Sequence, residues 1–215
     1  MSKLTSHVSY LVPRTSYLVS FLILLLSSCD AEYPFSQLYP CYFALKYQTH
    51  PTSLAFAAVQ SPGMYVGVTV SGDGRTTARH VYVTSNDGKT PREDNIIRTD
   101  EENYRTFQLG RNNSVGLVVG CTNFSGPMAY DRSCPNCTSL QALNFTGNGQ
   151  QVGCDKCGRT YDLETGGIVE GERGESLMRY ECRFDGAWLT VTNGLKPSIV
   201  QKPLAVTTFS ITFAY

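Results

Sequence analysis

Two Cys-x-x-Cys pairs constrain this chain more than any other feature of its sequence. The pairs are Cys134-Pro135-Asn136-Cys137 and Cys154-Asp155-Lys156-Cys157, with sixteen residues between them. A tight turn that carries two cysteines directs both sulfurs to one side, and two such turns together make a four-sulfur cage. Gly153 and Gly158 flank the second pair and give its backbone room to curl. The spacing predicts one metal site formed by Cys134, Cys137, Cys154 and Cys157.

Four cysteines in one cage do not determine which metal is bound. Thiolates bind zinc tetrahedrally, and they also bind iron–sulfur clusters or a single iron. Disulfides are a further alternative if the chain lies in an oxidising compartment. Thiol-exchange pairs usually open a helix of a βαβ unit, whereas short strands and turns are expected around both pairs here. The sequence therefore favours a structural role over thiol exchange.

The N-terminal segment has the pattern of a targeting signal. Lys3 and Arg14 supply positive charge, and the apolar run Leu18–Leu26 is too short for a membrane span. The run ends in Leu26-Ser27-Ser28-Cys29, which resembles a bacterial lipobox. The resemblance implies cleavage before Cys29 and attachment of acyl chains such as palmitate to that residue. We expect residues 1–28 to be a lipoprotein signal peptide and the mature chain to be membrane-anchored in the cell envelope. The alternatives are an ordinary signal peptide, or a short anchor followed by a chance cysteine.

The charge of the chain is balanced, with 18 Lys and Arg against 18 Asp and Glu. Removal of residues 1–28 takes away two basic residues and leaves a mildly acidic mature chain with 16 basic and 18 acidic residues. A nucleic-acid-binding domain usually carries a basic excess. The composition therefore gives no reason to expect a nucleic-acid partner.

The rest of the chain indicates an all-β fold with one or two short helices. Thirteen Tyr and ten Phe favour strands, and nineteen Gly favour turns. A short helix is expected over 53–60, after Pro51, with Thr52 or Ser53 as its N-cap. The charged segment 89–103 is expected to be a surface loop. Strands are expected over 42–47, 64–71, 80–84, 107–109, 115–121, 177–184, 188–192 and 204–215. We expect one domain over 41–215, behind a tether at 29–40.

Three segments resemble the Rieske iron–sulfur domain. Ala129–Pro135 is similar to the approach to the family's first ligand loop, and Cys154–Gly167 is similar to its second loop and exit. Leu177–Val191 is similar to the family's closing strands. The resemblance covers about residues 104–193, with metal loops at 131–139 and 152–162. It implies stacked antiparallel sheets whose two loops hold a metal at one tip.

The ligand positions depart from the Rieske pattern. The family's first pair is Cys-x-His, but Asn136 stands at the His position and Cys137 follows it. Cys157 replaces the His of the second pair. Two His ligands on one iron raise the potential of a Rieske cluster, and His50 and His80 of the mature chain lie far away in sequence. The usual Rieske chemistry is therefore not expected.

The export route favours zinc among the metals that four thiolates accept. Rieske proteins that cross a membrane generally travel folded, with a twin-arginine signal, and no twin arginine precedes the apolar run here. An unfolded export route favours a divalent ion acquired outside, which would also fix the loops. We expect a non-catalytic lipoprotein with a structural zinc ion and a binding or assembly role with an envelope partner. The alternative is an electron-transfer protein whose [2Fe–2S] cluster passes electrons to an oxidoreductase.

Few other residues have a chemical signature. Cys41, Cys121 and Cys182 remain after the cage is assigned, and they are expected to be buried thiols, with a Cys121–Cys182 disulfide as an alternative. His50 and His80 have no nucleophile or acid motif beside them, so no catalytic residue is assigned.

Residues near the second pair and in the last strands have expected structural places. Asp162 is expected to accept backbone hydrogen bonds in the loop that leaves the second pair, and Arg159 is expected to be exposed. Tyr180, Phe184 and Trp188 lie on alternating strands and are expected to pack on a sheet face or in the core.

Overall fold

The computed structural model describes residues 34–105 and 108–194. Two short α-helices occur there, α2 (Leu54–Gln60) and α3 (Asp100–Arg105), with one 3₁₀ turn, η1 (Gly147–Gly149). The strands are β1 (Tyr42–Lys46), β2 (Tyr65–Ser71), β3 (His80–Ser85), β4 (Glu93–Ile96), β5 (Leu117–Thr122), β6 (Gly126–Asp131), β7 (Asn144–Thr146), β8 (Gln151–Gly153), β9 (Thr160–Asp162), β10 (Ile168–Glu170), β11 (Arg179–Phe184) and β12 (Trp188–Thr192). The predicted all-β class is confirmed.

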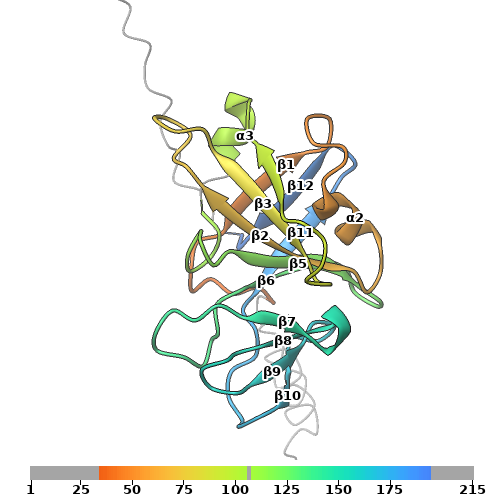
Figure 1. The fold of residues 1–215 in the computed structure, drawn as a ribbon, viewed down its shortest axis with the longest axis vertical. Coiled ribbons are helices and arrows are strands. Elements are labelled where there is room, and N and C mark those ends of the chain that lie inside the picture. The colour runs from red at the N-terminus through yellow and green to blue at the C-terminus, as the bar shows by residue number, and fades with distance from the viewer. Residues whose placement is uncertain (1–33, 106–107, 195–215) are drawn as a thin grey trace, which may run out of the picture. The chain divides into compact units, whose positions relative to one another are not determined.

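The strands form two antiparallel sheets (Figure 1). The larger sheet has eight strands in the order β1-β12-β11-β6-β5-β2-β3-β4 and curls into a half-barrel. The smaller sheet has the order β10-β9-β8-β7. Its strands lie in sequence between β6 and β11, which pair with each other through Tyr130↔Arg179 and Ala129↔Tyr180. The small sheet is therefore an insertion between two neighbouring strands of the large one.

Strand β5 separates two hydrophobic cores. All six of its residues are buried, and successive side chains of a strand point to opposite faces. Leu117 and Val119 belong to the core inside the curled sheet, which α2 also covers. Val118 belongs to a second core, which the small sheet and three cysteines of the Cys-x-x-Cys pairs share. Burial on both faces explains why this segment reads as a continuous apolar run.

Helix α2 confirms the helix predicted over 53–60. Ser53 is its N-cap, and the Ser53 hydroxyl accepts a hydrogen bond from the Ala55 N–H. The Glu93 carboxylate accepts hydrogen bonds from the Leu54 N–H and from the Ser53 hydroxyl, each at 3.1 Å. The start of this helix is thus attached to strand β4.

The prediction of a surface loop over 89–103 is wrong, because this segment contains β4 and the first turn of α3. Strand β4 pairs with β3 from His80↔Ile96 to Val83↔Glu93 and forms an edge of the large sheet. Glu102 in α3 has no exposed surface. Hydrogen bonds to the buried carboxylate compensate for the loss of water around its charge. The charged composition of the segment does not reveal these hydrogen bonds.

Other predicted elements differ in their bounds or fall outside the described residues. Of the strand predicted over 107–109, the described residue Gln108 forms an isolated bridge with Tyr42. The strand predicted from residue 177 begins at Arg179. The signal peptide, the first five residues of the tether and the strand predicted over 204–215 lie outside the described residues. Neither helix of the described part is long and apolar enough to cross a bilayer.

Candidate metal centre

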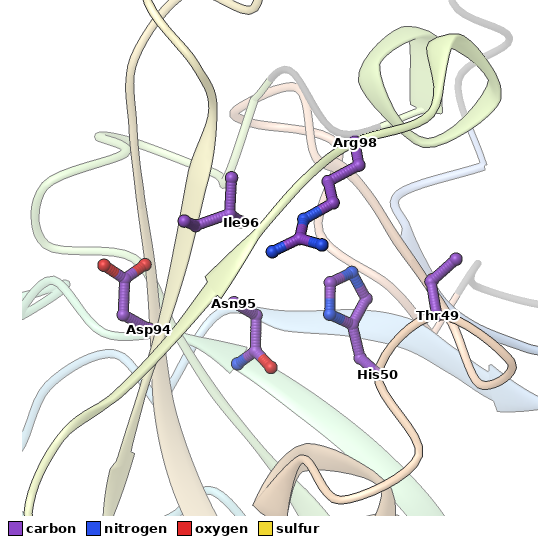
Figure 2. A pocket seen from close by; sticks show the side chains of 6 residues that line it. All are labelled: Thr49, His50, Asp94, Asn95, Ile96 and Arg98. Carbon is purple, nitrogen blue, oxygen red and sulfur yellow. The ribbon is translucent and has the colours of Figure 1, made fainter.

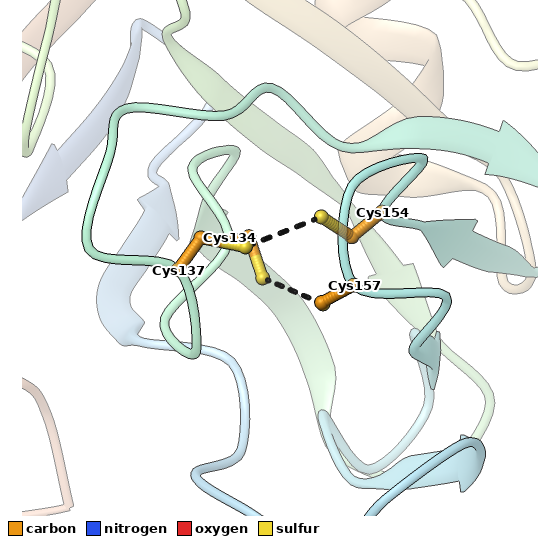
Figure 3. Close-up of side chains that lie close together, drawn as sticks. All are labelled: Cys134, Cys137, Cys154 and Cys157. Carbon is orange, nitrogen blue, oxygen red and sulfur yellow. Dashed lines mark hydrogen bonds between the residues drawn. The ribbon is translucent and has the colours of Figure 1, made fainter.

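The two Cys-x-x-Cys turns face each other beside the small sheet (Figure 3). The first turn follows β6, and the second turn connects β8 to β9. The Sγ atoms of Cys134 and Cys157 are 3.7 Å apart, as are those of Cys137 and Cys154. All four sulfurs lie within 4.8 Å of one another. The structure thus brings together the four residues that the spacing predicts as one site.

These separations suit a metal ion better than disulfides. A disulfide has an S–S distance of about 2.05 Å, and the cysteines of the described part are all free thiols. Four thiolates at about 2.3 Å from one tetrahedral zinc ion would lie about 3.8 Å from each other. The four-cysteine group is therefore at metal-binding distance.

The four thiols differ in exposure and in acidity. Cys134, Cys137 and Cys154 are buried, whereas Cys157 is partly exposed. Burial, with hydrogen bonds to the neighbouring thiols, raises the pKa of Cys137 to about 12. Burial also acts to raise the pKa of Cys157, but hydrogen bonds from the backbone and side chain of Arg159 outweigh it and bring this pKa to about 6. A bound cation would favour the thiolate form at all four positions.

Arg159 is not exposed as predicted, since its side chain keeps only 12% of its surface accessible. Its Nε donates to the carbonyl of Glu172 at 3.0 Å, and its Nη2 lies 3.2 Å from the Glu172 carboxylate. The same Nη2 donates to the carbonyl of Arg173. Arg159 therefore attaches the loop after β10 to the second turn and places a positive charge beside Cys157.

Asn136, in the first Cys-x-x-Cys turn, joins three segments of the chain. Its Nδ2 donates to the carbonyl of Glu175 at 2.7 Å and to the hydroxyl of Tyr161 at 2.9 Å. Its Oδ1 accepts a hydrogen bond from the Glu175 N–H at 2.9 Å. The Tyr161 hydroxyl lies 3.5 Å from Cys134 Sγ. Asn136 thus orients the loop beside the cage.

A buried carboxylate anchors the first turn to the large sheet. Asp131, which is 1% exposed, accepts hydrogen bonds from the Ser133 N–H at 2.8 Å and from the Ser133 hydroxyl. Its other oxygen accepts from the Arg111 N–H at 2.7 Å and from the Tyr180 hydroxyl at 3.0 Å. The Arg111 guanidinium in turn donates to the carbonyls of Cys137 and Thr138. Sequence reasoning missed this network, in which Asp131 is the buried last residue of strand β6.

The backbone of the second turn requires glycine at one position. Gly158 has φ +69°, in the left-handed region that side chains with a Cβ rarely adopt. Its N–H donates to the carbonyl of Cys154 at 2.9 Å, and the Cys154 N–H donates to the carbonyl of Arg159 at 2.9 Å. These bonds close the turn and direct both sulfurs to the same side.

The remaining predicted residues lie away from the cage. Cys41 and Cys182 are buried in the first core, and Cys121 is buried in β5, each as a free thiol. His50 and His80 contact the carboxylates of Glu102 and Asp94, far from the cysteines in the fold.

The expected places of the aromatic residues and of Asp162 agree with the structure. Tyr180 is fully buried and Phe184 packs against the first core, while Trp188 is half-buried. Asp162 accepts hydrogen bonds from the N–H and the hydroxyl of Thr165.

The fold and the site together define a class: an all-β protein with a four-cysteine group suited to a metal ion. Comparisons with protein-family models, with curated proteins and with solved structures gave no match to this chain. The function therefore has to be argued from the site itself.

Replacing Asn136 with alanine should loosen the loop beside the cage. The substitution removes both hydrogen bonds to the backbone of Glu175 and the one to the Tyr161 hydroxyl, and we expect a loss of about 1 kcal/mol in the free energy of unfolding. Urea unfolding measures this loss. Asn144→Ala is the matched control, because Asn144 makes one hydrogen bond to the exposed Asp155 and should cost less than about 0.5 kcal/mol. Equal losses in both variants would contradict the role given to Asn136.

Proposed function

We propose that Cys134, Cys137, Cys154 and Cys157 hold one structural zinc ion in a Rieske-like domain of a membrane-anchored, non-catalytic lipoprotein of the cell envelope. The observation that carries this proposal is the mutual distance of the four sulfurs, all within 4.8 Å. Such a distance supports a single ion with four thiolate ligands.

The sulfur distances also bear on the iron–sulfur alternative. A [2Fe–2S] cluster binds two thiolates at each iron, and its two bridging sulfides hold the thiolate pairs apart. In this site, each sulfur of the first turn has a sulfur of the second turn at 3.7 Å, and no pair of sulfurs exceeds 4.8 Å. This compact group favours one ion over a cluster with two metal centres.

The ligand set supports a structural ion instead of a catalytic one. Catalytic zinc sites keep one position for water or substrate, whereas four thiolates fill the tetrahedral coordination. Three of the four thiols are buried in the second core, so the ion would be held between the small sheet and the large one. Bound there, zinc would stabilise the two turns and the insertion that carries them.

The anchor is proposed from the sequence. The basic residues, the apolar run Leu18–Leu26 and the small residues before Cys29 agree with a lipoprotein signal. A lipid on Cys29 would tether the β domain to an envelope membrane, where we propose that it binds or assembles with a protein partner.

The metal is tested by elemental analysis and the visible spectrum of the purified protein. We expect a colourless protein with one zinc per chain, because zinc has a filled d shell and no redox chemistry. Two irons per chain with labile sulfide and a brown colour would refute the zinc proposal and support the electron-transfer alternative. One iron per chain without sulfide would support a site for a single ion but would show that the ion is iron and not zinc.

The anchor has a separate test, which does not depend on the metal. A labelled lipid precursor should be incorporated into the wild-type chain and into Cys121→Ala, but not into Cys29→Ala. Equal labelling of Cys29→Ala would refute lipid attachment at this residue and leave the zinc proposal standing.

A further inference from the structure

The edges of the curled sheet approach each other at a second site, remote from the cysteines. Strands β1 and β4 are its two edge strands. Glu102 of α3, which follows β4, accepts hydrogen bonds from the Lys46 N–H and the Thr49 hydroxyl at the end of β1. Glu93 of β4 binds the start of α2, as described above. Side-chain hydrogen bonds therefore connect the two edge strands, which do not pair with each other. We call the line along which these side chains meet the seam.

A hollow of about 370 Å³ lies along this seam (Figure 2). Its lining contains both positive and negative side chains, together with one aliphatic group. The lining residues are Thr49, His50, Asp94, Asn95, Ile96 and Arg98. Ile96 is 38% exposed and provides an apolar wall. The composition is that of a small polar binding site with one hydrophobic side.

Arg98 is the residue that points to a ligand. It is exposed, and no residue of the described part forms a hydrogen bond or an ion pair with its guanidinium. Arg79, by contrast, donates to the carbonyls of Asp73 and Asn103, and Arg92 lies over the ring of Tyr82. Figure 2 shows the Arg98 guanidinium directed toward the ring of His50. The planar fork of arginine matches a carboxylate or a phosphate group through two parallel hydrogen bonds.

His50 supplies a second polar group beside Arg98. Its side chain is 9% exposed, and its Nε2 lies 3.3 Å from Oε1 of the buried Glu102. This contact is not a hydrogen bond, and the buried nitrogen has no hydrogen-bond partner among the described residues. Burial acts to raise the pKa of Glu102, but the contact with His50 and the hydrogen bonds from Thr49, Lys46 and Thr99 outweigh it and lower the pKa. The ionised Glu102 therefore orients the imidazole at the wall of the hollow.

The carboxylates at the hollow already have partners within the protein. Both oxygens of Asp94 lie within hydrogen-bond distance of His80 Nδ1, at 2.8 and 3.0 Å. Glu102 is fully buried, accepts hydrogen bonds from Lys46, Thr49 and Thr99, and contacts His50. Among the lining residues, Arg98 therefore offers a cationic group that is free to bind a ligand.

From this arrangement we propose that the seam hollow binds a small anionic group, a carboxylate or a phosphate, with Arg98 as its main ligand and His50 as a second. The site shares no residue with the four-cysteine cage, so it goes beyond the proposed structural role of the metal.

The proposal is tested by nuclear magnetic resonance on the full chain, with inorganic phosphate and acetate titrated separately at constant ionic strength. We expect saturable shifts of the backbone amides of residues 49–50 and 94–98 with at least one of the two anions. The anion that saturates identifies the chemistry of the ligand. Shifts that grow linearly with both anions, without saturation, would overturn the proposal.

Two arginine variants separate specific binding from general charge. Arg98→Gln should lower the affinity for the saturating anion at least tenfold. Arg92 is an exposed arginine near the same strand, and Arg92→Gln should leave this affinity unchanged. His50→Gln should weaken binding less than Arg98→Gln does. Equal affinities in Arg98→Gln and Arg92→Gln would contradict the assignment.

Discussion

Replacing Cys154 with serine is expected to abolish metal binding and to lower the free energy of unfolding by more than about 3 kcal/mol. Cys154 is 3% exposed and lies between Cys137 and the strands of the small sheet. A serine hydroxyl is a poor ligand for zinc beside three thiolates, and the loss of the ion leaves the two turns without their common partner. The small sheet should therefore unfold before the large one.

Metal analysis and thermal unfolding of Cys154→Ser measure these two effects together. Cys121→Ala is the matched control, because Cys121 is also a buried free thiol but lies outside the cage in β5. The control should keep one metal per chain and lose only the packing of one sulfur, about 1 kcal/mol. A Cys154→Ser variant with full metal content and the melting temperature of the parent would refute the four-cysteine cage.

The second large effect is expected at Glu102, far from the cysteines. Its carboxylate has no exposed surface and accepts hydrogen bonds from the Lys46 N–H and from the hydroxyls of Thr49 and Thr99. Glu102→Ala leaves these donors without their acceptor and His50 without the carboxylate beside it, and we expect a loss of about 3–5 kcal/mol in unfolding free energy. Urea unfolding at neutral pH measures this loss.

A neighbouring acidic residue provides the control for Glu102. Glu101 pairs with Lys46 and Arg105, but its side chain is 47% exposed. Exposed ion pairs contribute little, so Glu101→Ala should cost less than about 1 kcal/mol. Similar losses in Glu101→Ala and Glu102→Ala would mean that the buried network does not hold the seam.

Glu102 should also give the stability a dependence on pH. Because its pKa is lowered in the folded protein, the unfolded chain takes up the proton first as the pH falls. The contribution of Glu102 is complete above the unfolded pKa of about 4.3 and is lost as the pH falls through the lower folded value. Between pH 5 and pH 3, approximately, Glu102→Gln should lose less stability than the parent does. Loss of metal in acid affects both proteins alike, so a parallel pH profile of the two would contradict this role.

The cage and most strands could be predicted from local sequence. Two cysteines three positions apart bring their sulfurs to one side by turn geometry alone, and this needs no knowledge of the fold. Strand β5 was predictable because both its faces are buried, which leaves an uninterrupted apolar run. Helix α2 carried its own start signal in Ser53.

Long-range hydrogen bonds account for what the sequence did not reveal. Glu102 appears as one of three consecutive acidic residues, and its burial depends on donors more than fifty positions earlier in the chain. Arg159 appears as an ordinary surface arginine until the loop at Glu172 folds over it. The role of Asn136 could not be predicted from the residues around it, because the three groups that it contacts lie in β9 and in the segment before β11.

The insertion of the small sheet between β6 and β11 has a consequence for the order of folding. Strand β11 has to find β6 across the whole inserted segment, and the entropy lost in closing a loop grows with its length. An ion that joins Cys134 to Cys157 shortens the free part of that segment before the strands meet. A bound metal would then speed the pairing of β6 with β11, and the rate at which the eight-stranded sheet is completed would depend on when the ion is captured.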